Sequence, residues 1–181
     1  MTREEAYELA KSRLKNRNLF KHVLAVEAVM RALARHFGED EERWGLAGLL
    51  HDLDYEETKD DPERHTLVTA ELLQNYDVDE EIVHAIKAHN NRVPRESLMD
   101  KAIYAADPVT GLIVAAALMH PSKKLAGIDV PFILRRFKEK RFAAGANREQ
   151  IRSCEEIGLS LEEFLDIALR AMQGISEDLG L

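Results

Sequence analysis

The amino-acid sequence predicts an all-α protein, and three observations support that prediction. Apolar residues recur every three or four positions along most of the chain, which is the spacing of an amphipathic helix. Signals for helix N-termini separate these stretches, and no run alternates with the period of two expected for a strand. With 181 residues, 45% of them hydrophobic and 32% charged, the chain is predicted to form a single compact domain over residues 1–181.

Capping residues indicate where the helices begin. Thr2 and Glu5 form a capping-box pattern at the start of the first one. Such signals predict helices over residues 2–15, 19–37, 40–52, 61–75, 79–89, 98–119, 129–141, 147–157 and 160–174. The segment 53–60 is predicted to be a charged loop. Pro108 is expected to kink or divide the sixth helix, which leaves open that Asp107 caps a new helix there.

The composition predicts a cytoplasmic protein. The chain has one cysteine, Cys154, so no disulfide can form within it. Its longest apolar run, residues 111–119, is shorter than the roughly 20 residues that cross a membrane. Its first residues are too polar and acidic for a secretory signal. We therefore expect no membrane partner.

The net charge of −8 is unevenly distributed along the chain. A negative charge argues against stable nucleic-acid binding, but residues 123–152 carry nine Lys or Arg and three acids, a local net charge of +6 that leaves −14 elsewhere. This segment is predicted to be either a solvated helix or a cradle for an anionic substrate. Arg148 is the first candidate for binding that substrate because it follows Asn147 at a predicted helix N-terminus, where anions bind favourably. Lys123 and Lys124 are weaker candidates, and the alternative for Arg148 is an ion pair with a nearby surface acid.

Ionisable residues occupy the inward faces of several predicted helices. His51 shares a helix face with Trp44 and Ala47, and Asp52 follows it directly. The other ionisable positions on apolar faces are His22, His65, His89 and Asp107. Any one of them alone could be a core residue bonded to backbone, but buried ionisable groups need partners and are expected to converge. Histidines with two aspartates form a nitrogen and oxygen ligand set that suits Mn, Fe, Co, Ni or Zn, and Mg less well.

The order His, His-Asp, His, His, Asp resembles that of the HD-domain metal-dependent phosphohydrolases, an all-helical superfamily named after the adjacent His-Asp pair. The matching stretches are Lys21-His22-Val23, Leu49-Leu50-His51-Asp52-Leu53-Asp54, Arg64-His65-Thr66, Ala88-His89-Asn90 and Ala105-Ala106-Asp107. The resemblance implies an HD core over about residues 18–119. Residues 120–181 would then form a C-terminal helical extension.

The resemblance further implies two divalent metal ions. The ligands that it assigns to the first ion are His22, His51, Asp52 and Asp107. It assigns His65 and His89 to the second ion, with Asp52 as the bridge. Asp54 is expected to hydrogen-bond to the ligands from behind, and the pair His51 and Asp52 is predicted to form the catalytic centre.

Two branches of the superfamily differ from this chain at specific positions. The cyclic-dinucleotide phosphodiesterases carry a lysine soon after the pair and a double histidine later, where this chain has Asp54-Tyr55 and His89-Asn90. The alarmone hydrolases carry Glu then Asp four residues after their histidine, where this chain has Tyr55-Glu56. The prediction is therefore a reaction class: hydrolysis of a phosphomonoester or phosphodiester in a small, anionic, nucleotide-like substrate. The alternative is a regulatory or ligand-binding HD module that holds metal without turnover.

Overall fold

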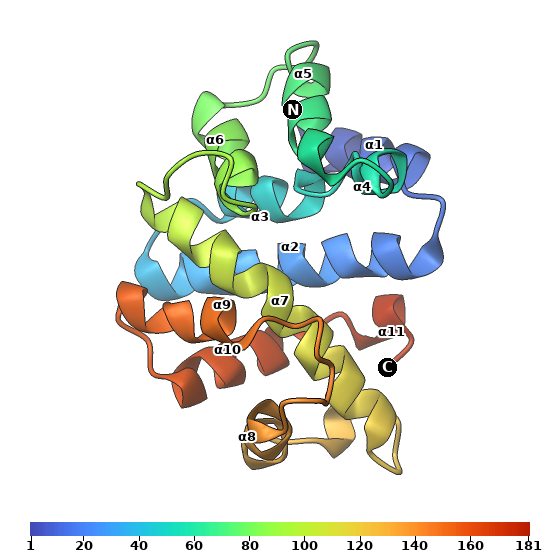
Figure 1. Ribbon diagram of the computed structural model, residues 1–181, viewed down its shortest axis with the longest axis vertical. Helices are drawn as coiled ribbons and strands as arrows, with labels where there is room; N and C mark the ends of the chain where they lie inside the picture. Colours follow the sequence, from blue (N-terminus) through green and yellow to red (C-terminus); the bar gives the residue numbers. More distant parts are fainter.

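The computed structural model describes residues 1–181 and contains helices and no strands, as predicted (Figure 1). Two long helices, α2 (Arg17–Phe37) and α7 (Leu98–Met119), cross in the middle of the molecule. The other α-helices are α1 (Arg3–Arg13), α3 (Glu41–Leu50), α4 (Tyr55–Thr58), α5 (Leu67–Leu73), α6 (Glu80–Ala88), α8 (Val130–Lys138), α9 (Arg148–Arg152), α10 (Leu161–Gln173) and α11 (Ser176–Leu179). Short 3-10 segments cover Pro62–Arg64, Leu125–Gly127 and Ser153–Ile157.

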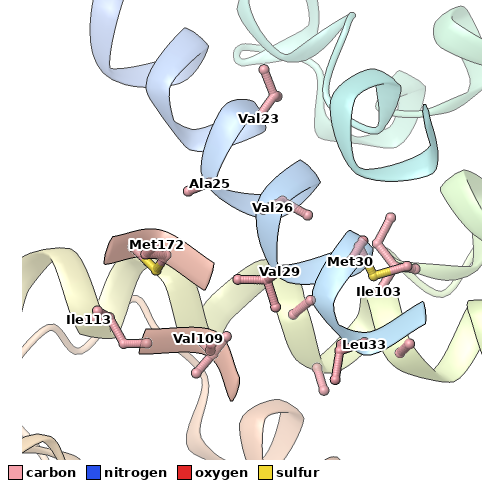
Figure 2. Close-up of a cluster of buried hydrophobic side chains, with 14 of the residues drawn as sticks. Val23, Ala25, Val26, Val29, Met30, Leu33, Ile103, Val109, Ile113 and Met172 are labelled. Carbon is pink, nitrogen blue, oxygen red and sulfur yellow. The ribbon is translucent and has the colours of Figure 1, made fainter. Parts of the chain in front are cut away.

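The crossed helices α2 and α7 separate two groups of elements. Helices α1 and α3 to α6 lie on one side of α2, and α8 to α11 lie on the other (Figure 1). Helix α10 packs against both α2 and α7, so the C-terminal residues share the hydrophobic core of the earlier ones. The side chains labelled in Figure 2 belong to that core: Val23, Ala25, Val26, Val29, Met30 and Leu33 of α2, Ile103, Val109 and Ile113 of α7, and Met172 of α10.

Gly48 allows α3 to lie directly against α2. A Cβ atom at Gly48 would stand 2.8 Å from both the Cα and the amide nitrogen of Glu27. These are backbone atoms that cannot move aside easily, so a side chain here would push the two helices apart. The close approach brings the end of α3 beside the start of α2, and both of those segments carry candidate ligands.

Three predicted segments differ from the structure. The helix expected over residues 61–75 is divided, because Thr66 has a φ of 70° and separates the 3-10 turn at Pro62–Arg64 from α5. The expected helix 147–157 is α9 followed by a 3-10 segment. The charged loop 53–60 contains the short helix α4.

Helix α7 continues through Pro108, so the alternative that Asp107 caps a new helix is wrong. Proline has no backbone N–H, and the carbonyl four residues earlier loses its helical partner. That carbonyl belongs to Tyr104, and it accepts a hydrogen bond of 3.2 Å from the side chain of Gln150 on α9. By length and composition α7 is also long and apolar enough to cross a membrane, which was not predicted. Of the apolar stretch of this helix, 56% is buried inside the fold.

Candidate metal centre

His51 and Asp52 lie at the C-terminal end of α3, where the helix gives way to a turn. His51 is the C-cap residue, and its Nδ1–H donates to the carbonyl of Gly48 at 2.6 Å. That bond fixes the tautomer, because a carbonyl can only accept. The Nε2 atom of His51 therefore carries the lone pair and points away from α3, while the side chain is fully buried.

His89 repeats this arrangement at the end of α6. It is the C-cap residue there, and its Nδ1–H donates to the carbonyl of Ile86 at 2.5 Å. His65 lies in the break before α5 instead of on the helix face that the sequence predicted. Its Nδ1–H donates to the Oδ1 atom of Asp54 at 2.6 Å, and the other oxygen of Asp54 accepts from the backbone of Thr69 at 2.9 Å.

His22 approaches from α2 and is held by α7. The hydroxyl of Thr110 donates to the carbonyl of Asp107 at 3.0 Å, so its oxygen is free to accept from the Nδ1–H of His22 at 3.2 Å. All four imidazoles thus have an acceptor for Nδ1–H. Hydrogen bonds of this kind orient histidine ligands in metal sites and raise their basicity.

The Nε2 atoms converge on the carboxylates of Asp52 and Asp107. The Oδ1 atom of Asp107 lies 2.8 Å from Nε2 of His22 and 3.1 Å from Nε2 of His51. The Oδ2 atom of Asp52 lies 3.4 Å from Nε2 of His22 and 3.3 Å from Nε2 of His51. In this group of His22, His51, Asp52 and Asp107, the ligand atoms all lie within 4.8 Å of one another.

The second oxygen of Asp52 faces a second group. Its Oδ1 atom lies 3.3 Å from Nε2 of His65 and 3.6 Å from Nε2 of His89. These ligand atoms also lie within 4.8 Å of one another. Asp52 is therefore common to both groups, with one oxygen toward each.

Mutual pairing controls the ionisation of this cluster. Burial opposes the charged form of His22, but hydrogen bonds to Asp107 and Asp52 outweigh it and raise the pKa of this histidine to about 10. Burial likewise opposes the charged form of His65, yet Asp52 and Asp54 raise its pKa to about 9. Burial disfavours the ionised form of Asp52, and the neighbouring imidazoles more than compensate, which holds its pKa well below the ordinary range.

The donor chemistry fits a divalent metal. Four imidazole nitrogens oriented by their own acceptors, together with two ionised carboxylates, form a nitrogen and oxygen ligand set. Without a cation, the lone pairs of His22 and His51 would face each other, since their Nε2 atoms are 3.3 Å apart. A bound cation, or protons in its absence, removes that repulsion.

A family model described as HD domain matches residues 19–117 of this chain. The chain belongs to the HD-domain family. Among curated proteins it is similar to Ribonuclease Y of Oleidesulfovibrio alaskensis, with 33% identity over 96 residues, or 53% of this chain and 18% of the relative. Ribonuclease Y of Sulfurovum sp. is 31% identical over 135 residues, or 73% of this chain and 26% of the relative. Ribonuclease Y of Desulfotalea psychrophila is 27% identical over 165 residues, or 82% of this chain and 32% of the relative.

The chain thus spans less than a third of the length of these curated relatives. No solved structure matches it. The matched residues 19–117 contain all six candidate ligands, and HD domains bind divalent metals. The resemblance to the HD superfamily and the all-α fold are thereby confirmed.

The HD-domain cluster lies in a cleft of about 700 Å³. Besides the candidate ligands other than His51, the cleft is lined by Tyr55, Asn90 and Asn91 from the HD core and by the loop before α9, including Asn147. Gln150 of α9 lines it too. The polar groups around the metal centre are therefore mostly neutral amides.

The three basic residues predicted to bind substrate do not line this cleft. The guanidinium of Arg148 donates instead to six backbone carbonyls, those of Arg136, Phe137, Glu139, Phe142, Ala143 and Ala146. An arginine has five N–H donors, so none is left for a phosphate. The predicted substrate role of Arg148 is wrong, and so is the alternative of an ion pair with a surface acid. Lys123 donates to the carbonyl of Leu118, and Lys124 is exposed elsewhere on the surface.

Sequence reasoning missed the residues that support the ligands. Asn90 donates to the carbonyl of His65 at 3.2 Å and accepts from the hydroxyl of Thr66 at 3.0 Å. Thus Asn90, which stands where the cyclic-dinucleotide phosphodiesterases have the second histidine of their pair, holds the segment that carries His65. Thr110 was detectable, because it lies three residues after Asp107 and so on the same face of α7. Asn90 was not, because its partner is a backbone carbonyl.

Proposed function

We propose that this chain is a metal-dependent phosphohydrolase that cleaves a phosphodiester bond in a short, nucleotide-containing substrate, with two divalent ions held by the six-residue cluster. The observation that carries the proposal is the orientation of Asp52. Each of its oxygens faces a separate set of imidazole nitrogens, and a carboxylate in this position suits a bridge between two ions.

The six ligands divide unequally between the two proposed ions. His22, His51 and Asp107 would hold the first ion with one oxygen of Asp52, and His65 and His89 would hold the second with the other oxygen. Divalent ions in such a site lower the pKa of a water molecule and neutralise phosphate oxygens. His65, His89 and one oxygen of Asp52 are fewer protein ligands than a closed structural site uses, so they would leave room for water or substrate, as a catalytic site requires.

The side chains of the protein would orient both the candidate ligands and the reacting phosphate. Asp54, which is 2% exposed, fixes the ring of His65 through Nδ1. The amides of Asn91, Asn147 and Gln150 can donate to ester oxygens or to a base without adding charge. A phosphodiester carries less charge than a monoester, so neutral donors suit it. The names of the relatives, Ribonuclease Y, favour a ribonucleotide phosphodiester.

Elemental analysis and a substrate screen test this proposal together. Protein purified under reducing conditions should contain about two equivalents of a divalent metal. It should hydrolyse bis(p-nitrophenyl) phosphate or the dinucleotide ApA when supplied with Mn, Fe, Co, Ni or Mg. Metal bound at full stoichiometry without turnover of any ester would instead support a regulatory HD module.

A further inference from the structure

A second hollow, of about 460 Å³, adjoins the metal cleft, and Asn91 lines both. The charged side chains around it are those of Arg92, Arg95, Lys101 and Glu156. None of the three cations forms an ion pair with a carboxylate, whereas seven arginines elsewhere in the chain do. We refer to the space between these residues as the basic hollow.

The two arginines of the basic hollow are held in place by neutral groups. Arg92 donates through Nη2 to the carbonyl of Pro62 at 2.7 Å and through Nε to that of His65 at 3.3 Å. Arg95 donates through Nη1 to the side chain of Asn91 at 2.8 Å, and its guanidinium lies 3.7 Å from the ring centroid of Tyr104. Neutral acceptors and an aromatic face orient an arginine without cancelling its charge.

Several donors remain free after these contacts. Arg92 retains Nη1, Arg95 retains Nε and Nη2, and the amine of Lys101 makes no hydrogen bond within the protein. Free donors on two oriented guanidinium groups and an ammonium group match the oxygens of a phosphate. Asn91, which has a φ of 66°, lies at the boundary that the two spaces share.

The charge of the basic hollow is opposite to that of the molecule. The chain as a whole carries −8, so a phosphorylated substrate meets general repulsion. Three unpaired cations beside the cleft, with Glu156 as the one acid that lines the same space, provide local attraction for an anion next to the candidate metal centre. A positively charged cradle for the substrate was predicted in residues 123–152, whereas the basic hollow lies mainly in residues 91–101 of the HD core.

We propose that the basic hollow binds a second phosphate group of the substrate, distinct from the phosphate hydrolysed in the metal cleft. This inference rests on the proposed function for the position of the first phosphate. It narrows the substrate class to a nucleotide chain that carries a further phosphate next to the scissile bond. Neutral amides would then contact the scissile diester, while arginine and lysine would contact its charged neighbour.

Kinetics on three dinucleotides test the proposal. ApA has only the scissile phosphate, whereas pApA and ApAp each add one terminal phosphate. The wild type should favour pApA or ApAp over ApA, and Lys101→Gln should reduce that preference about ten- to a hundredfold, the loss expected for one charge-assisted hydrogen bond. Glu156→Gln should increase the preference. Lys138→Gln, which removes an exposed lysine outside both spaces, is the matched control and should leave it unchanged.

Equal kcat/KM for the three dinucleotides in the wild type, or a preference that Lys101→Gln leaves intact, would overturn the proposal. A separate measurement does not depend on turnover. Inorganic phosphate titrated into the full chain should shift the NMR signals of the Nε–H groups of Arg92 and Arg95, and Lys101→Gln should weaken that response. If no ester is hydrolysed but these signals respond, the proposed function fails and the anion site stands; unresponsive signals at millimolar phosphate reject the site.

Discussion

The HD core and the C-terminal extension use their wholly or partly buried ionisable side chains in different ways. In the core, each of four histidines donates Nδ1–H to a nearby acceptor and turns Nε2 toward Asp52, and two of them, His22 and His51, also face Asp107. In the extension, Arg148 turns its guanidinium to backbone carbonyls of α8 and of the loop that precedes α9. Both arrangements answer the same requirement, that a polar group removed from water must find a partner. Only the arrangement in the HD core leaves nitrogen lone pairs free to bind a metal ion.

The difference teaches that a charged residue partly removed from water is not by itself a sign of function. A cluster becomes a candidate site when its members still have unused lone pairs or donors after their local partners are counted. By that test the metal centre and the basic hollow are candidates, and Arg148 is not. Each of the following predictions tests that distinction, from the largest expected effect to the smallest.

Asp52→Ala should abolish metal binding and hydrolysis together. Asp52 is the one residue common to both ligand groups, and its loss would leave four imidazoles with one carboxylate. Elemental analysis and a phosphodiester assay measure the two effects. Glu57→Ala, which removes an exposed acid from the neighbouring helix α4, is the control and should retain both properties. An Asp52→Ala protein with full metal and full turnover would show that the core cluster is only a buried ion-pair network.

The double variant His65→Ala and His89→Ala should lower the metal content from about two equivalents to about one. These histidines contact only one oxygen of Asp52, and the other group keeps all four of its ligands. The circular dichroism spectrum should stay that of the wild type, because both residues follow the ends of helices. Unchanged stoichiometry in this variant, or wild-type protein that saturates at one equivalent, would make the centre mononuclear.

The sequence was sufficient to predict the fold class, the approximate helices and the six residues that meet at the centre. Inward-facing histidines such as His22 and His51 interrupt apolar stripes, and that interruption is visible in one dimension. The sequence was misleading for His65, because the break at Thr66 uses a left-handed backbone without a glycine to signal it. It could not assign Arg148, since its partners are carbonyls, which every residue has.

Asp54→Asn should weaken metal binding about 10- to 100-fold, the usual cost of removing an outer hydrogen-bond partner of a ligand. Asp54 accepts from His65 with one oxygen and from the backbone of Thr69 with the other. An asparagine keeps the shape but loses the charge that strengthens His65 as a ligand. Competition with a chelator of known affinity measures the change, and the effect should fall on one equivalent of metal and spare the other. Equal weakening of both equivalents would mean that Asp54 acts on the cluster as a whole.

The smallest effect is expected for Arg148→Ala, which should raise KM a few-fold and leave metal content unchanged. The loop that Arg148 holds forms one wall of the cleft, so its loss should loosen that wall without touching a ligand. The loop should also become more sensitive to trypsin at Arg141, which is exposed, and limited digestion detects this. Arg152→Ala is the matched control, because Arg152 lies on the same short helix and pairs only with exposed Glu155. A direct phosphate contact would behave differently: the KM effect would shrink as salt screens the charge, and digestion would stay at the wild-type rate.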